Sequence, residues 1–181
     1  MKDLLIADAR KYIGDKSEKS FNRFKLTITH TSYKYTSLLR KAKYYKGKNK
    51  FLYLIYRYRL LRTSIKLGYQ IGVDANIGGG LYLGHRGMVV VNGKTTLGEN
   101  VSLANGVTIG QENRGKRKGV PTIGNKVWIG ANAVIVGKIT IGDDVLIAPN
   151  AYVNFDVPSH SVIVGNPARI INRENATEAY L

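Results

Sequence analysis

Four residues of this sequence have the types and the spacing to do chemistry together: His85, Asn105, Ala131 and Pro149. Each lies two positions after a regularly spaced aliphatic residue, so a fold that coils on that period stacks them into one column, here called the corner column. A neutral imidazole removes a proton from a hydroxyl as that oxygen attacks a carbonyl carbon, and a free backbone N–H near Ala131 could hold the resulting oxyanion. We therefore expect acyl transfer, which suits a thioester donor, with His85 as the base.

His85 also has other interpretations. It is one of three histidines, and a lone histidine after a glycine can be an exposed turn residue without a chemical role. We expect His30, in a helical segment, and His160, in a Pro-Ser-His turn, to be structural. Metal-dependent hydrolysis would need three imidazoles at about 2.0–2.1 Å from one ion, and we expect neither of these two to meet His85 within the chain. The sequence therefore predicts no metal site.

The elements that must position this column follow a period of six residues. A six-residue period fits neither the helical turn nor simple strand alternation, and it is typical of a parallel β-helix with three units per coil. The period has two interruptions, a two-residue insertion placed around Val89 and Val90 and an eight-residue insertion in a loop at residues 111–122. The aliphatic residue and the residue four positions after it would face inward and form the core. The aliphatic positions are Ile71, Ile77, Leu83, Val91, Leu97, Leu103, Ile109, Ile123, Ile129, Ile135, Ile141, Ile147 and Val153.

Glycine follows the aliphatic residue in most units, because a side chain at that corner would obstruct the turn or the strand above it. We expect the loop at residues 111–122 to project beside the corner column. Its polar, cationic segment at residues 111–118, which includes Arg114, could receive an anionic saccharide or a nucleotide- or lipid-diphosphate sugar. A solvated run of charges is the equal alternative.

Residues 1–66 are expected to form a basic, tyrosine-rich helical region. Residues 1–70 hold 18 Lys and Arg against 4 Asp and Glu, while residues 71–181 hold 10 against 8. Apolar spacing predicts helices near residues 4–13, 21–28, 36–45 and 49–66, with a break at Lys46-Gly47-Lys48. This composition fits a packed bundle, an anionic membrane or polysaccharide surface, or nucleic acid. No recognised nucleic-acid motif is present, so we expect no nucleic-acid partner.

Composition excludes further classes of function. The chain has no cysteine, so disulfides, thiolate catalysis and cysteine-based zinc sites are excluded. Residues 1–15 lack the apolar run and cleavage site of a signal peptide, and no stretch reaches the 18–20 apolar residues, roughly, of a membrane span. We expect a cytoplasmic protein, peripheral at the inner face of the membrane if its basic helices bind lipid.

Four segments carry a family resemblance: residues 80–85 (GLYLGH), 105–110 (NGVTIG), 127–131 (VWIGA) and 164–169 (VGNPAR). Together they resemble the hexapeptide-repeat acyltransferases, most closely the serine acetyltransferase-like group. Within that group the chain looks like the O-acetyltransferases that modify bacterial capsular polysaccharides and exopolysaccharides. The resemblance implies a mainly β fold, with a left-handed parallel β-helix at residues 67–171, an N-terminal α-helical segment and a C-terminal tail at residues 172–181.

The resemblance also implies a cofactor, an assembly and site residues. It implies acetyl-CoA as co-substrate, bound between neighbouring subunits of a homotrimer whose active sites lie between the subunits. His85 matches the catalytic base, while Ala131 and Pro149 match positions whose backbone meets the pantetheine arm and the thioester. Arg169, and more weakly Lys138, could meet the phosphates of CoA, although a solvated charge is the alternative for Arg169.

Trp128 matches an aromatic residue near the acyl site of related sugar acetyltransferases, or it only packs. Serine acetyltransferases pair their histidine with an aspartate fifteen residues earlier, where this chain has Gln70, and they carry aspartate directly before it, where this chain has Gly84. Their serine-gripping Arg-His-Pro is replaced by Gly-Val-Pro at residues 119–121. Serine would therefore lose its hydration with no charged groups to replace it.

From these departures we expect the acceptor to be a sugar hydroxyl of a surface polysaccharide or of its precursor. Asn105, Trp128, Arg114 and Gln70 are the residues expected to line the acceptor side of the site. Three alternatives stay open: serine as the acceptor, an amino sugar as the acceptor, and a non-enzymatic, membrane-associated assembly protein.

Overall fold

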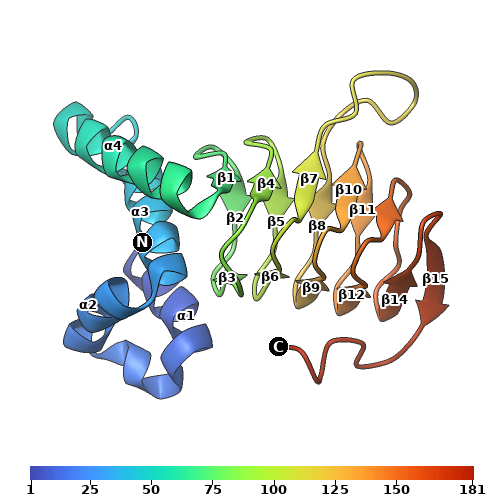
Figure 1. Ribbon diagram of the computed structural model, residues 1–181, viewed down its shortest axis with the longest axis horizontal. Helices are drawn as coiled ribbons and strands as arrows, with labels where there is room; N and C mark the ends of the chain where they lie inside the picture. The colour runs from blue at the N-terminus through green and yellow to red at the C-terminus, as the bar shows by residue number, and fades with distance from the viewer.

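The computed structural model describes residues 1–181, and it places a helical region at one end of a long coil of short strands (Figure 1). The helical elements are α1 (Lys2–Ile13), a 3-10 helix (Gly14–Glu18), α2 (Ser20–Thr29), α3 (Thr31–Tyr45) and α4 (Lys50–Leu67). The chain breaks between α3 and α4 at Lys46-Gly47-Lys48, as predicted. Helix α3 begins five residues earlier than expected, because buried Ser32, Tyr33 and Tyr35 pack its first turns against the rest of the molecule. No helix is both long and apolar enough to cross a membrane.

Fifteen strands form three sheets that wrap around a common axis. The first sheet holds β1 (Tyr69–Ile71), β4 (Val89–Val91), β7 (Thr108–Gly110), β10 (Val134–Val136) and β13 (Tyr152–Val153). The second holds β2 (Asn76–Ile77), β5 (Thr96–Leu97), β8 (Thr122–Ile123) and β11 (Thr140–Ile141). The third holds β3 (Tyr82–Leu83), β6 (Ser102–Leu103), β9 (Val127–Ile129), β12 (Val145–Ile147), β14 (Ser161–Val164) and β15 (Arg169–Asn172).

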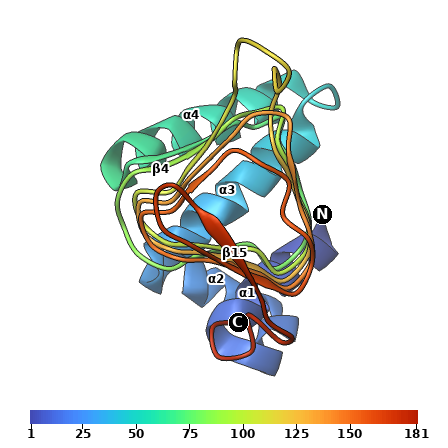
Figure 2. The same ribbon diagram turned by 90° about the vertical axis from the view of Figure 1, so that its right-hand side faces the viewer.

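The register confirms the parallel β-helix that the six-residue period predicts. Leu83 pairs with Leu103, Leu103 with Ile129, and Ile129 with Ile147, so residues one coil apart stack directly. Each of the aliphatic positions is at most 8% exposed, and the core cluster contains 32 buried residues. Seen end-on, the coils superimpose as a triangle (Figure 2). The left hand of the coil stays a prediction from the resemblance.

The glycines at one corner are required by close approach of successive coils. A Cβ atom on Gly98 would lie 2.6 Å from the carbonyl carbon of Gly124, and a Cβ on Gly124 would lie 2.8 Å from that of Gly142. Real Cβ contacts do not reach such distances, so the backbones would have to separate. The glycines at this corner are therefore structural, as the sequence indicates, whereas a Cβ on Gly84 would meet only a Tyr82 ring carbon, at 3.4 Å.

The helical region and the β-helix share one core. Tyr35, Leu38 and Leu39 of α3 and Leu60 of α4 belong to the same buried cluster as the inward residues of the coil. The Tyr35 hydroxyl accepts a hydrogen bond from the backbone N–H of Ile71 at 3.1 Å. The first coil is therefore closed by the helices, which fixes their position relative to its corners.

A buried ion pair joins the same two parts. Arg40 of α3 contacts both carboxylate oxygens of Asp8 of α1 at 3.0 Å, and its guanidinium also donates to the carbonyl oxygens of Ile77 and Gly78. Asp8 in turn accepts hydrogen bonds from the backbone N–H groups of Gly80 and Leu81. We call this the Asp8–Arg40 clamp, because one pair satisfies backbone groups of the first coil from two helices.

The C-terminal tail folds back along the outside of the coil (Figure 1). Strand β15 pairs antiparallel with β14, and the chain then reverses toward the helical region. The Asp144 carboxylate accepts hydrogen bonds from the N–H groups of Ala176 and Thr177 and from the Thr177 hydroxyl. Tyr180 lies on Trp128 with ring centroids 4.7 Å apart. Asp144 and Trp128 thus hold the end of the tail, and the Arg173 N–H, which donates to the His160 carbonyl at 2.8 Å, holds its start.

This arrangement predicts release of the tail in acid. Desolvation alone would raise the pKa of Asp144, but hydrogen bonds from Thr177, His160 and two backbone amides outweigh it and lower the pKa from 3.8 to about 2. A lowered folded-state pKa contributes stability above pH 4, here about 2 kcal/mol, which is lost as the pH falls toward 2. We expect fluorescence of the single tryptophan, Trp128, to change between about pH 4 and 2 as Tyr180 leaves it. The Asp144→Asn variant should lack this transition, and an unchanged transition in that variant would refute the account.

Candidate active site

The two-residue insertion lies at His85 and Arg86. Gly84 still donates its N–H to Leu103 of the next coil, yet Gly87 already lies beneath Asn105, since a Cβ on Gly87 would meet the Asn105 Cβ at 3.1 Å. The residues between Gly84 and Gly87 are therefore the extra ones. The expected position of the insertion, around Val89 and Val90, is wrong: both belong to β4 and pair in regular register. His85 thus projects from a bulge at the base of the corner column and does not occupy a regular level of it.

The helical region holds this bulge in place. The Tyr69 hydroxyl donates to the His85 carbonyl oxygen at 2.7 Å and also contacts the Ser32 hydroxyl at 2.9 Å. Burial raises the pKa of Tyr69, so its hydroxyl stays protonated and remains a donor. Arg86 donates from Nε to the Thr31 hydroxyl at 3.2 Å. The His85 backbone is therefore fixed, while its exposed imidazole makes no hydrogen bond within the chain and is free to meet a substrate.

The bulge forms one wall of an open pocket of about 420 Å³ between the helical region and the first coil. Lys11, Tyr12 and His30 line the pocket from the helical side, opposite His85 and Arg86. His30, which the sequence places far from His85, therefore shares its pocket, and it packs edge-on against Tyr12 at 5.8 Å. Partial burial lowers the pKa of Lys11. The pocket is lined by cationic and hydroxyl groups, and no carboxylate faces it.

Above the bulge the corner column is regular. Asn132 donates its N–H to the Asn105 carbonyl at 3.0 Å, and Asn150 donates to the Ala131 carbonyl at 2.9 Å, so the turns bearing Asn105, Ala131 and Pro149 are linked one above another. The N–H of Ala131 lies at a corner outside the strands and has no acceptor in the chain. With strands about 4.8 Å apart, Ala131 lies roughly 10 Å beyond the bulge. The column can therefore offer a backbone donor to a substrate lying along it.

The long loop does not lie beside this column within one chain. Residues 111–122 follow β7 of the first sheet, whereas the column follows strands of the third sheet, so the two occupy different corners of the triangle (Figure 2). The loop is closed at its base by paired hydrogen bonds between Glu112 and Gly119, and the Lys138 N–H donates to the Arg117 carbonyl. Arg114, at the loop, and Lys138, beneath it, are thus separated from His85 by the width of a sheet. The expectation that the loop projects beside the column is wrong, because the loop separates Ile109 of the first sheet from Ile123 of the second, whereas the column follows strands of the third.

Three other predicted residues also lie apart from the pocket. Gln70 is exposed on the outer face of β1 and makes no hydrogen bond to His85. Trp128 faces outward on β9 and packs on Tyr180, which fits the packing alternative for this residue. Arg169 is exposed on β15 at the far end of the coil. In a single chain, the structure therefore stacks Asn105, Ala131 and Pro149 directly, and it places His85 on the bulge at their base.

Sequence reasoning missed the residues that hold the bulge. Tyr69 lies two positions before Ile71, an inward position by strand alternation, so its burial could have been inferred. Ser32 and Thr31 carry no periodic signal, because their role depends on how α3 packs against the coil.

The chain is similar to known hexapeptide proteins. The family model "Bacterial transferase hexapeptide (six repeats)" matches residues 121–154. A serine acetyltransferase of Helicobacter pylori is 44% identical over 108 residues, which are 59% of this chain and 63% of that protein. The chain thus spans less than two thirds of the length of this curated relative.

Solved structures match over nearly the whole chain. The serine acetyltransferase of Brucella abortus strain S19 aligns with a TM-score of 0.77 and 30% identity over 96% of this chain and 70% of that one. A structure of it in complex with coenzyme A aligns with a TM-score of 0.76 at 28% identity, over 94% and 67%. The Neisseria gonorrhoeae enzyme in complex with serine aligns with a TM-score of 0.73 at 28% identity, over 93% and 67%. These matches are serine acetyltransferases, so they do not support the closer resemblance to capsular and exopolysaccharide O-acetyltransferases.

Proposed function

The chain belongs to the hexapeptide-repeat transferases and, within them, to the homologues of serine acetyltransferase, and on that premise we propose that it transfers an acetyl group from acetyl-CoA to an acceptor hydroxyl. The observation that carries the proposal is the bulge, which presents a free imidazole at the base of a column of stacked turns. A structural relative in complex with coenzyme A supports acetyl-CoA as the donor. The reaction is direct transfer in a ternary complex.

In this reaction His85 acts as the general base. Its imidazole takes the proton of the acceptor hydroxyl as that oxygen attacks the acetyl carbonyl carbon. A new C–O bond forms, the C–S bond breaks, and the imidazolium returns the proton to the departing sulfur. A backbone N–H of the column, with Ala131 as the candidate, donates to the oxyanion. The attacking oxygen, the carbonyl carbon and the oxyanion lie between the His85 imidazole and the Ala131 N–H. Two strand spacings separate the levels of these two groups in the coil, which leaves room for the reacting atoms.

The donor is assigned to the corner column. Asn105, Ala131 and Pro149 form a continuous edge from the bulge toward the far end of the coil, and we place the pantetheine arm along it. Arg169 lies at that far end, where it could pair with a phosphate. Lys138 lies at another corner of its own chain, so it could reach a donor only from a neighbouring subunit. This is consistent with the proposed homotrimer, in which each active site lies between two subunits.

Serine is the first acceptor to test, because the relatives carry that activity in their names and one of them is in complex with serine. A saccharide hydroxyl is the second candidate, and the site chemistry favours it. The pocket beside His85 holds no carboxylate to pair with the amino group of serine. A neutral or anionic acceptor needs no such partner.

A thiol-release assay with acetyl-CoA tests the function. Serine, free sugars, nucleotide sugars and deacetylated capsule fragments are offered in parallel, and the product is identified by mass. The proposal expects acceptor-dependent release of CoA and an ester that mild base removes. With a sugar as the acceptor, a product stable to mild base would identify an amino sugar, and failure to bind acetyl-CoA would favour the non-enzymatic assembly protein.

We also propose that the helical region contacts an anionic membrane surface. Helix α4 presents an outward row of apolar side chains at alternating spacings of three and four residues: Phe51, Leu54, Tyr58, Leu61 and Ile65. Residues 19–73 contain 14 Lys and Arg and no Asp or Glu. An anionic lipid surface would cover the exposed apolar row and pair with the cations around it. The like charges oppose pairing with a second copy.

The expected result is cosedimentation with vesicles that contain phosphatidylglycerol, weakened by salt, and none with pure phosphatidylcholine vesicles. Phe51→Ser/Ile65→Ser should reduce binding at least several-fold. Exposed Met88, replaced by serine, serves as the matched control. Equal binding to both kinds of vesicle, or a change of oligomeric state with the double variant and no vesicle binding, would refute the membrane assignment.

A further inference from the structure

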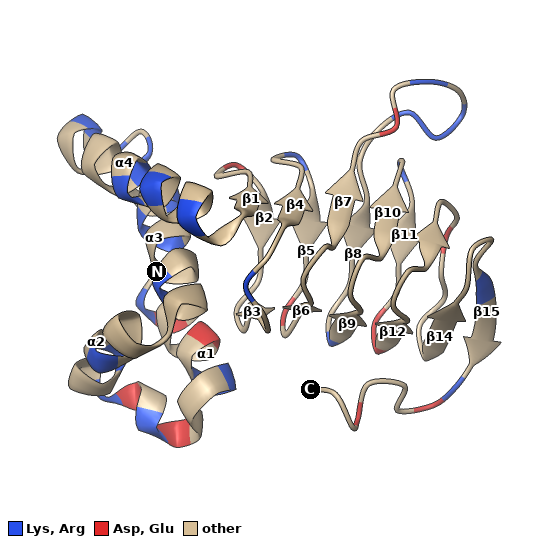
Figure 3. Cartoon of the chain, in the orientation of Figure 1, with Lys and Arg blue, Asp and Glu red and all other residues tan.

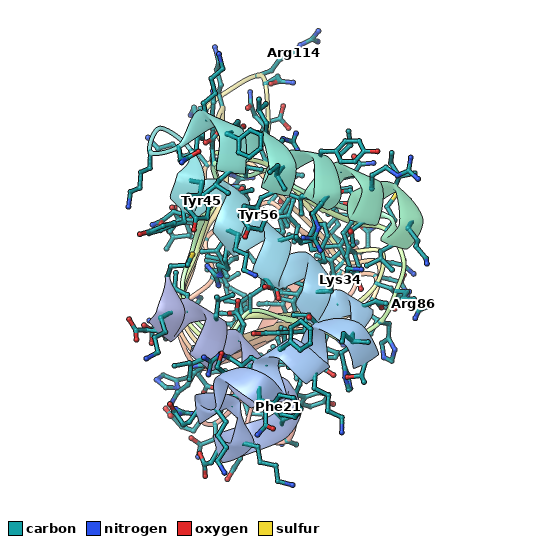
Figure 4. The ribbon with its side chains drawn as sticks, turned by 90° about the vertical axis from the view of Figure 1, so that its left-hand side faces the viewer. Phe21, Lys34, Tyr45, Tyr56, Arg86 and Arg114 are labelled. Carbon is teal, nitrogen blue, oxygen red and sulfur yellow. The ribbon has the colours of Figure 1, made fainter.

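A second pocket, of about 560 Å³, adjoins the His85 pocket. Lys34 of α3 and Arg62 and Lys66 of α4 line it, and no acidic side chain does. Thr31 lines both pockets, and its hydroxyl accepts the hydrogen bond from Arg86, the residue next to His85. Figure 4 shows Lys34 and Arg86 at the same edge of the helical end. We call Lys34, Arg62, Lys66 and Arg86 the cationic cluster.

None of these four cations forms a salt bridge in the chain. The ion pairs of the structure involve Arg10, Arg40, Lys46 and His160 as their basic members. Figure 3 shows basic residues along α4 with no acidic residue among them. Three like charges that share one concave surface, with Arg86 at its edge beside Thr31, attract an anion strongly, because no internal carboxylate competes for them. Such a surface is poorly matched to a neutral acceptor alone.

The position of the cluster relative to His85 decides which anion it fits. The corner column leaves the bulge toward the far end of the coil, while the cationic cluster lies on the opposite side, against the helices. An anion in the cluster would thus be separated from a donor on the column by His85 itself. This arrangement fits an acceptor molecule whose reacting hydroxyl and whose charged group lie on different parts of it, with the hydroxyl at His85 and the charge in the cluster.

We propose that the cationic cluster binds a phosphate or diphosphate group of the acceptor and so directs the acceptor hydroxyl toward His85. The inference rests on the proposed acetyl transfer and names the class of its substrate: a hydroxyl compound, such as a sugar, joined to phosphate. The planar guanidinium groups of Arg62 and Arg86 suit bidentate phosphate contacts, and the two lysines add mobile point charges. A pocket of about 560 Å³ has the size of an ordinary small-molecule site.

Acetyl-CoA carries phosphates too, so the test must distinguish phosphate of the acceptor from phosphate of acetyl-CoA. Its first arm is calorimetric titration with inorganic pyrophosphate, which needs no catalysis. Lys34→Gln/Arg62→Gln should bind pyrophosphate at least about tenfold more weakly than the wild type, because two charge-assisted contacts are lost. Lys94→Gln/Arg173→Gln removes the same charge from exposed positions outside the pocket and should bind as the wild type does. Equal binding by both double variants would overturn the proposal.

The second arm is kinetic, with UDP-glucose, glucose 1-phosphate and glucose as acceptors. For a phosphorylated acceptor, Lys34→Gln/Arg62→Gln should raise KM at least about tenfold and leave KM for acetyl-CoA unchanged. A raised KM for acetyl-CoA with an unchanged acceptor KM would assign the cluster to the donor and overturn the proposal. If serine is acetylated and none of these three compounds is, the acetyl transfer stands and the proposed acceptor class is wrong. If serine is not acetylated either, the acetyl transfer fails, and the pyrophosphate titration still decides whether the cluster is a phosphate site.

Discussion

Replacing His85 with alanine is expected to lower the rate of acetyl transfer about 10²–10⁴-fold, the range that general acid–base catalysis contributes. The loss should fall on kcat, because the imidazole acts on the proton that moves in the transition state. It should not unfold the protein, since the side chain is exposed and makes no hydrogen bond within the chain. Thiol release at saturating acetyl-CoA measures the change.

Two comparisons make this result specific. Binding of acetyl-CoA by His85→Ala should match the wild type within a small factor, because the donor is assigned to backbone groups of the column. His160→Ala is the matched control, as His160 pairs with Asp144 at the tail, away from the pocket, and should retain transfer. Near-normal thiol release by His85→Ala would remove His85 from the mechanism.

Replacing Asp8 with alanine is expected to lower the free energy of unfolding by about 3–5 kcal/mol, the cost of breaking a buried ion pair from one side. The Asp8 side chain is fully buried and that of Arg40 is 5% exposed, so the guanidinium would be left charged without its carboxylate. The backbone N–H groups of Gly80 and Leu81 would also lose their acceptor. Urea unfolding at one fixed protein concentration measures the change.

Asp15→Ala is the control, since the Asp15 carboxylate is fully exposed and lies 3.9 Å from Arg10. It should leave the unfolding curve unchanged. Asp8→Ala/Arg40→Met should be more stable than Asp8→Ala, because the orphaned charge is removed together with its partner. If Asp8→Ala unfolds within about 1 kcal/mol of the wild type, the clamp does not hold the helices to the coil.

The period was sufficient to predict the core. Three six-residue units make one coil, so the number of residues between two inward positions shows whether they stack. Leu83, Leu103, Ile129 and Ile147 could be aligned in this way by counting. The count also gave the correct length of each interruption. These are properties of the repeating backbone, which each unit encodes for itself.

The site was less predictable because it depends on where a coil departs from its period. Counting shows that two residues are extra between Leu83 and Val91, but only hydrogen bonds show that they are His85 and Arg86. The corner taken by the long loop, in contrast, follows from the count, because the loop separates the unit of Ile109 from the unit of Ile123. Tyr69 and Ser32 act through packing between the helices and the first coil, a long-range contact that local spacing does not encode.

The measurement that tests the central claim most directly is the distance from the CoA sulfur to the nearest His85 imidazole in a crystal structure of the complex. The account predicts about 5–6 Å, which one attacking hydroxyl oxygen can bridge. It also predicts that the pantetheine arm runs along Asn105, Ala131 and Pro149. A sulfur more than about 10 Å from every His85 of the assembly would contradict it, because no single oxygen could then contact both base and thioester.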